Sequence, residues 1–211
     1  MAEIKLEKIT KSFRENTVLT GASFLFEDGK TYGIVGPNGC GKSVLFKIIS
    51  GLMKPNSGIV TVGNRKIGVN GVMPEKMGIL IESPGFIPEL TGRENLEVLA
   101  SIRREISESQ IYAMIDTVGL TKAAKTQVKK YSLGMVQRLG IAQALMENPE
   151  VLLLDEPFNS VDQEGVSLMR RIIKDYTYSH KVTTILSSHN SDDVEFLCDE
   201  IVQLKDGKLV V

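Results

Sequence analysis

The chain has 211 residues, of which 42% are hydrophobic and 24% are charged, a composition ordinary for a globular protein. This length suffices for one domain with a substantial core, or for a domain that carries a lobe. With a formal net charge of -1, the chain lacks the excess of positive charge that favours binding to nucleic acid or to an anionic membrane. No apolar run is long enough to span a membrane. If the protein serves a membrane process, we expect another chain to cross the bilayer.

The two cysteines, Cys40 and Cys198, lie far apart and lack metal-ligand spacing. The sequence from Met1 carries no export signal, so we expect a reducing, cytoplasmic setting. Cys198 falls on the apolar face of a predicted helix. Both thiols are therefore expected to be small buried side chains rather than catalytic groups.

The first 30 residues predict an antiparallel β layer. Residues 4–9 alternate apolar and charged side chains, and residues 18–26 continue with strand-like composition. A following apolar run, residues 31–35, predicts the strand that leads into the next motif.

A glycine-rich segment, residues 36–43, lies between this strand and a helix-like run at residues 44–50, the context that a phosphate-binding P-loop requires. Its glycines let backbone N–H groups surround a polyphosphate, and the helix N-terminus adds positive potential. We expect Lys42 to reach the β and γ phosphates and Ser43 to place its hydroxyl on the bridging Mg²⁺. An ordinary glycine-rich turn is the alternative. The expected nucleotide-binding residues are Gly36, Pro37, Asn38, Gly39, Cys40, Gly41, Lys42, Ser43 and Val44.

The middle of the chain changes from strands to helices. Residues 58–82 are rich in Gly, Val and Ile and predict strands separated by turns at residues 63–64 and 70–71. Capping boxes then begin at Thr91 and Ser107, each followed by apolar residues at helical spacing, and Gly119 is expected to close the second helix. A helical lobe over residues 90–148 is thus predicted as an insertion into an α/β core formed by residues 1–89 and 149–211.

The last third of the chain predicts alternating strands and helices. Four consecutive apolar residues, 151–154, are typical of a strand buried on both faces of a parallel sheet. The later elements are a helix over 163–178 with Asp162 as N-cap, a strand over 182–186, a helix around 192–197, and a closing hairpin of residues 201–204 and 208–211.

Asp155 and Glu156 end the buried strand, at the sheet edge where hydrolysis of a magnesium nucleotide requires acidic groups. We expect Asp155 to accept hydrogen bonds from magnesium-bound water or from Ser43. Glu156 is the candidate general base that polarises the attacking water. A turn or helix cap is the alternative interpretation of the pair.

Residues 151–162, with His189 beyond the next strand, resemble the ATPase subunit of an ABC transporter, and the resemblance covers essentially the whole chain. It implies an α/β fold, a P-loop NTPase of the ABC-cassette type, that uses ATP and Mg²⁺. It further implies that His189 bonds the γ phosphate and orients Glu156, that Phe13 stacks on adenine, and that Asp162 is the D-loop aspartate. A core aromatic and a plain helix cap are the alternatives for Phe13 and Asp162.

By the same resemblance, residues 131–135 form the signature segment, with Ser132 and Gly134 at the positions nearest phosphate. Such a helix N-terminus serves the ATP held by a second copy, so two cassettes would enclose two nucleotides head to tail and a monomer would hydrolyse weakly. Tyr131, Leu133 and Met135 depart from the common LSGGQ pattern. A plain N-cap is the alternative.

Glu82 stands where the family usually carries the Q-loop glutamine. A carboxylate can also accept a hydrogen bond from magnesium-bound water, but it adds negative charge beside the phosphates. Glu82 is therefore a candidate catalytic and metal-contacting residue, or a solvated loop residue. Its segment, residues 81–91, resembles the subgroup that energises bacitracin, lantibiotic and multidrug export.

The leading hypothesis is an ATP-hydrolysing subunit, peripheral on the cytoplasmic face of the membrane, that powers a separate permease for export of a drug, peptide or antibiotic. Pro84, Phe86 and Ile87 form a possible docking loop, or pack under the helical lobe. A soluble ABC ATPase that controls a non-transport assembly process is the alternative, but no basic stripe indicates nucleic acid. A nucleotide sensor without turnover is disfavoured by the presence of Glu156 and His189.

Overall fold

The computed structural model describes residues 2–14, 16–68, 72 and 74–211. The predicted turn at residues 70–71 lies outside this part. The described strands are β1 (Ile4–Phe13), β2 (Asn16–Phe26), β3 (Thr31–Val35), β4 (Ser57–Val62), β5 (Arg65–Ile67), β6 (Met77–Leu80), β7 (Val151–Asp155), β8 (Thr183–Ser187), β9 (Glu200–Lys205) and β10 (Lys208–Val210). The described α-helices are α1 (Lys42–Ile49), α2 (Gly92–Arg103), α3 (Glu108–Thr117), α4 (Leu133–Leu145), α5 (Gln163–His180) and α6 (Ser191–Leu197), with short 3₁₀ turns at Thr121–Ala123 and Val128–Lys130.

The predicted antiparallel layer is present as a four-stranded sheet in the order β2-β1-β4-β5. In β1, Ile4 and Leu6 are buried while Lys5 and Glu7 are exposed, which is the alternation of a strand with one face on a core. Ile4 pairs with Phe26 across β1 and β2, and bulges interrupt the register further along.

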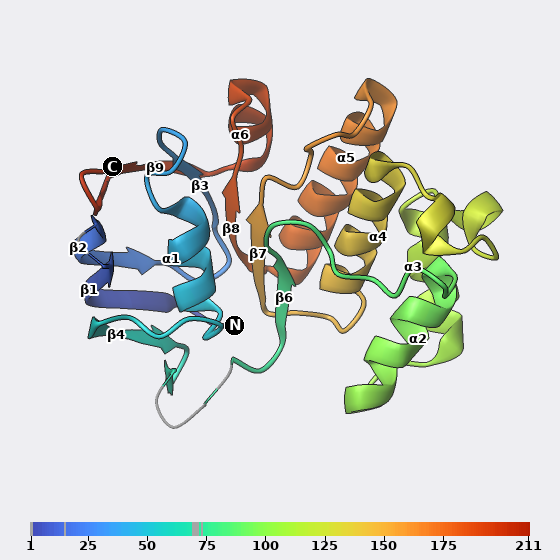
Figure 1. The fold of residues 1–211 in the computed structure, drawn as a ribbon, viewed down its shortest axis with the longest axis horizontal. Helices are drawn as coiled ribbons and strands as arrows, with labels where there is room; N and C mark the ends of the chain where they lie inside the picture. Colours follow the sequence, from blue (N-terminus) through green and yellow to red (C-terminus); the bar gives the residue numbers. More distant parts are fainter. Residues whose placement is uncertain (1, 15, 69–71, 73) are drawn as a thin grey trace.

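A second sheet of six strands, in the order β10-β9-β3-β8-β7-β6, forms the centre of the molecule. Strands β3, β6, β7, β8 and β9 are parallel, and every residue of β7 and β8 is buried. In Figure 1, α1 lies on one side of this sheet with the antiparallel layer beyond it, whereas α4 and α5 lie on the other side. The sheet therefore has two covered faces, as its apolar strands require.

Parallel strands place their carboxyl ends at one edge of the sheet. The P-loop follows β3, Glu82 comes shortly after β6, Asp155 ends β7, and His189 comes shortly after β8. These segments, far apart in sequence, are thereby brought to the same edge.

The helical segment between β6 and β7 begins as predicted, because its start signals are local. Thr91 and Ser107 each form a complete capping box. The predicted C-cap is shifted by one residue: Val118 is the C-cap of α3, and Gly119 follows it with a φ of 70°. The helical segment shares one hydrophobic core with β7 and α5. Because this core is continuous, the division of the chain into a core and a separate lobe at residues 90–148 stays a prediction.

Two helices are longer than predicted. Helix α1 starts at Lys42, inside the P-loop motif, and α5 continues to His180, whose Nδ1 lies 3.0 Å from the Tyr176 carbonyl oxygen. Helix ends depend on such single contacts. Among the described residues, no helix combines the length and the apolar character needed to cross a bilayer.

Candidate active site

A pocket of about 310 Å³ opens at the carboxyl edge of the central sheet. It draws together segments from β1, β2, the P-loop, β7 and the loop after β8. Its lining residues are Phe13, Val18, Asn38, Gly39, Gly41, Lys42, Ser43, Val44, Asp155, Glu156 and His189. Ten of these eleven residues are sequence-predicted site residues, and Val18 is the exception.

The P-loop backbone requires glycine at Gly41. Its φ is 110°, and a Cβ there would lie 2.4 Å from Val18 Cγ1. Lys42 is buried, and its Nζ donates to the carbonyl oxygens of Gly36 (2.8 Å) and Pro37 (3.3 Å). A buried ammonium inside a loop of backbone N–H groups is suited to an anionic ligand.

Three predicted P-loop residues do not line the pocket: Gly36, Pro37 and Cys40. Gly36 faces the interior instead, where a Cβ would lie 2.7 Å from the Leu204 carbonyl oxygen. Cys40 packs against the core between the two sheets, but both cysteines are half-buried rather than fully buried as predicted. The second cysteine, Cys198, is also packed against a core, and burial raises its pKa to about 12.

Ser187 fixes the acidic pair. Its Oγ donates to Asp155 Oδ1 (2.7 Å) and accepts from the Glu156 backbone N–H (3.0 Å). Asp155 and Ser187 are register partners of β7 and β8. The neighbouring strand therefore orients the Asp155 carboxylate and fixes the backbone of Glu156 at the edge of the sheet.

Glu156 and His189 lie side by side. Glu156 Oε1 is 3.1 Å from His189 Nε2 in an ion-pair contact that does not meet hydrogen-bond geometry, and Oε2 accepts from the His189 backbone N–H at 3.3 Å. Burial raises the pKa of Glu156 above its ordinary value, while the charge of His189 opposes this rise. A carboxylate held in this way is a stronger base than an exposed glutamate.

The oxygen donors of the pocket fit Mg²⁺. Ser43 and Asp155 supply a hydroxyl and a carboxylate, which are hard ligands for this hard cation. Within the part of the chain that the structure describes, no group of three or more His, Cys, Asp or Glu is placed to hold a metal by itself. The set suits an ion that keeps water and phosphate ligands, as Mg²⁺ does with nucleotides.

Phe13 lies at the mouth of the pocket, at the end of β1, and is 44% exposed. Lys11 Nζ is 5.1 Å from the ring centroid. The ring is therefore an accessible aromatic surface rather than a core side chain, so the geometry favours the interpretation as a base-stacking residue.

The signature residues are not part of this pocket. Ser132 is the N-cap of α4, where its Oγ accepts from the Met135 N–H at 3.2 Å, and Leu133 is 73% exposed. Helices α4 and α1 lie on opposite sides of the central sheet (Figure 1). A Cβ on Gly134 would lie 3.2 Å from the Ser160 carbonyl oxygen, so this glycine allows close approach of the chain's own backbone.

Asp162 also lies outside the pocket and caps α5, with Oδ1 accepting from the Gly165 N–H at 2.9 Å. Glu82 is outside it as well. The Glu82 side chain is bound instead to Lys47 in the last turn of α1.

Two contributors were missed from the sequence. Val18 contacts the P-loop from β2, and its apolar type in a strand resembles any core residue. Ser187 was visible only as part of the segment around His189. A polar residue ending a buried strand beside the acidic strand is the signal that could have identified it.

Comparisons with known proteins show the family of the chain. A family model described as ABC transporter matches residues 19–159. The chain is 36% identical over 206 residues to the uncharacterized ABC transporter ATP-binding protein YybJ of Bacillus subtilis (strain 168), covering 98% of this chain and 94% of that protein. It is 38% identical over 209 residues to the bacitracin transport ATP-binding protein BcrA of Enterococcus faecalis, covering 98% and 68%. The lantibiotic transport ATP-binding protein SrtF of Streptococcus pyogenes is 36% identical over 208 residues, with 99% and 89% covered.

The fold is similar to the dimeric structure of MJ0796, described as a bacterial ABC transporter cassette, with a TM-score of 0.89 and 25% identity over 99% of this chain and 97% of that one. A second structure of MJ0796, a post-hydrolysis state bound to ADP and phosphate, has the same TM-score at 24% identity. The family match spans more than half of the chain, and the relatives exceed 30% identity over nearly all of it. The protein therefore belongs to the ABC transporter family, as an ATP-binding cassette with ATPase function.

Proposed function

We propose that this cassette hydrolyses ATP in a head-to-tail dimer and thereby powers a separate permease in the membrane. The proposal of a dimer is supported by one observation: the nucleotide pocket is separated from the exposed N-terminus of α4. A helix N-terminus is suited to bind phosphate, yet this one lies across the sheet from the chain's own P-loop. A second copy is the partner that would bring the two together.

In this proposal each group of pocket residues has its own role in binding or hydrolysing ATP. Lys42 and the P-loop N–H groups hold the phosphates, and Phe13 stacks on the adenine. Glu156 accepts a proton from the attacking water, and His189 orients the carboxylate and contacts the γ phosphate. Ser43 and Asp155 would hold Mg²⁺, which neutralises charge on the phosphates when bound. From a second copy, Ser132 and Gly134 contribute the N-terminus of α4, and Asp162 lies near by on its D-loop.

The role of Glu156 is tested by Glu156→Gln. This change keeps the size of the side chain but removes the base, so steady-state hydrolysis should fall by about 100-fold or more while ATP binding persists. Phosphate release and equilibrium nucleotide binding measure the two properties. Unchanged turnover would contradict the assignment of the base.

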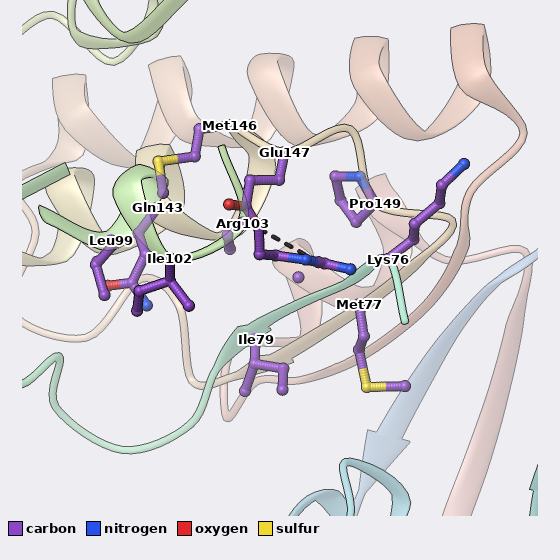
Figure 2. Close-up of a pocket in the computed structure, with 12 residues that line it drawn as sticks. Lys76, Met77, Ile79, Leu99, Ile102, Arg103, Gln143, Met146, Glu147 and Pro149 are labelled. Carbon is purple, nitrogen blue, oxygen red and sulfur yellow. Dashed lines mark hydrogen bonds and ion pairs between the residues drawn. The ribbon is translucent and has the colours of Figure 1, made fainter. Parts of the chain in front are cut away.

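A second cavity, of about 230 Å³, is a candidate docking site for a cytoplasmic helix of the permease. It lies between β6, α2 and the end of α4 (Figure 2). Leu99, Ile102, Met77 and Ile79 give it apolar walls, and Ile102 is 76% exposed. Arg103 spans one side and contacts Glu147. An exposed apolar surface with a polar rim is typical of a protein interface.

The predicted docking loop contributes only partly to an exposed surface. Pro84 packs on α4, where a Cβ on Gly140 would lie 2.7 Å from Pro84 Cγ, and Phe86 packs against the helical core. Ile87 is the exposed member of the three. Two of the three residues therefore pack against the helices, and the cavity beside α2 is the better candidate for docking.

Ile102→Glu tests this site. Because the side chain is exposed, the change should leave folding and the basal ATPase rate unaltered, but it should abolish co-purification of a polytopic membrane protein in mild detergent. Tyr178→Glu, at another exposed apolar position, is the matched control and should retain the partner. Retention by both variants would contradict docking at this cavity. Recovery of ribosomes or nucleic acid without a membrane protein would overturn the transporter proposal.

Export of a drug, peptide or antibiotic is supported by the names of the relatives, which are bacitracin and lantibiotic transport proteins. Deletion of the protein from its host should lower the inhibitory concentration of such a compound if this proposal holds. A soluble ABC ATPase for a non-transport assembly process is the alternative, and an unchanged sensitivity to all such compounds would favour it.

A further inference from the structure

The ion pair between Lys47 and Glu82 has no part in the proposed chemistry, although it joins two segments of the nucleotide site. Lys47 Nζ lies 2.5 Å from Glu82 Oε1. Lys47 is in the last turn of α1, and Ser43 is in its first turn. Glu82 comes shortly after β6, which is separated from β3 by two strands of the sheet. Helix α1 therefore reaches from the P-loop to the segment that contains Glu82.

The spacing along α1 determines where Glu82 is held. Ser43 and Lys47 are four residues apart, so they share one face of the helix at a separation of about 6 Å along its axis. Lys47 thus binds the carboxylate about one helical turn beyond the hydroxyl that we assign to Mg²⁺. At this position Glu82 does not line the nucleotide pocket.

The charges explain why such a contact is useful. A free carboxylate beside ATP would repel the phosphates whenever no metal lies between them. Lys47 neutralises this carboxylate. The pair is also solvated, with the Glu82 side chain 62% exposed and that of Lys47 28% exposed, so it is weak enough to be exchanged for a stronger partner.

We propose that Lys47 is a positioning residue that competes with the Mg²⁺ of the bound nucleotide for Glu82. Without the metal, Lys47 withholds the carboxylate from the phosphates. With the metal, Glu82 leaves Lys47 and accepts from magnesium-bound water. This inference rests on the proposed nucleotide site and is independent of the permease.

Nucleotide binding to the whole chain tests the proposal without relying on turnover. The readout is the ratio of the dissociation constants for a non-hydrolysable ATP analogue in EDTA and in Mg²⁺. Lys47→Gln should raise this ratio about fivefold, because binding weakens in EDTA and Glu82 is released to the metal. Lys47→Arg keeps the cation and should behave as the wild type. In a Glu82→Gln background, Lys47→Gln should leave the ratio unchanged.

Lys5→Gln is the matched control, because it removes one lysine charge and one exposed ion pair, Lys5 Nζ to Glu7 Oε1 at 2.9 Å, on the antiparallel sheet. It should leave the ratio unchanged. If Lys47→Gln changed the ratio equally in the wild-type and Glu82→Gln backgrounds, the proposal would be overturned, because the lysine would then act on the nucleotide directly. No effect in either background would overturn it too. Failure of the wild type to bind the analogue would instead contradict the proposed nucleotide site itself.

Discussion

At the scale of single residues, the burial of Glu156 sets the pH range in which it can act as a base. Its pKa is raised chiefly by burial, so the carboxyl remains protonated to a higher pH than an exposed glutamate, whose pKa is about 4.3. Only the deprotonated form accepts a proton from water. Hydrolysis should therefore decline in acid with a midpoint above the ordinary value for glutamate.

The pH dependence of kcat checks this expectation, with circular dichroism to show that the protein stays folded. The residual rate of Glu156→Gln should lack the decline that belongs to this group. A wild-type rate that stays flat down to the ordinary pKa of glutamate would contradict the role of burial.

The sequence identified most of the pocket at this scale, for a physical reason. Asp155, Glu156 and His189 follow apolar strands, and parallel strands bring such positions to one sheet edge. Val18 and Ser187 were not identified, because their contacts depend on how the two sheets pack and on the register of β7 and β8. The partner of Glu82, 35 residues away in the chain, was equally invisible.

At the scale of elements, the close packing of α4 on β6 depends on Gly78. A Cβ at this position would lie 2.0 Å from the Ala144 carbonyl oxygen, which is backbone and cannot rotate away. Gly78→Ala should therefore lower the free energy of unfolding by about 3 kcal/mol through overpacking. Chemical denaturation measures the loss.

Gly85→Ala is the matched control for this substitution. Nothing lies within 4 Å of a Cβ at Gly85, and its φ is not positive. Its effect should stay within about 0.5 kcal/mol. Equal stabilities of the two variants would show that α4 can shift away from β6, contrary to the packing described here.

Element starts were predicted better than their ends. Thr91, Ser107 and Asp162 are local caps, so α2, α3 and α5 begin where the sequence places them. The start of α1 was the exception, since the last residues of the P-loop motif already belong to the helix. The order of the strands in the central sheet was not predicted, because pairing between distant strands leaves no local signal.

At the scale of the whole molecule, two copies of the proposed ATPase are needed to complete each nucleotide site. Glu156 of one copy and Ser132 of the other would then belong to the same site. A chain with Glu156→Gln and a chain with Ser132→Arg are each expected to be inactive alone, because every site in either homodimer carries a defect. In a mixed dimer, one nucleotide site contains both substitutions, and the other contains the unchanged Glu156 and the unchanged Ser132.

Mixing these two inactive variants tests whether each nucleotide site contains residues of both copies. Random pairing of equal amounts should restore hydrolysis to about a quarter of the wild-type rate, since half of the dimers hold one intact site of two. Both variants must be folded and must bind ATP separately. Recovery near that level is expected if the two copies share their nucleotide sites. Rates that remain at the sum of the two separate variants at every mixing ratio would contradict it.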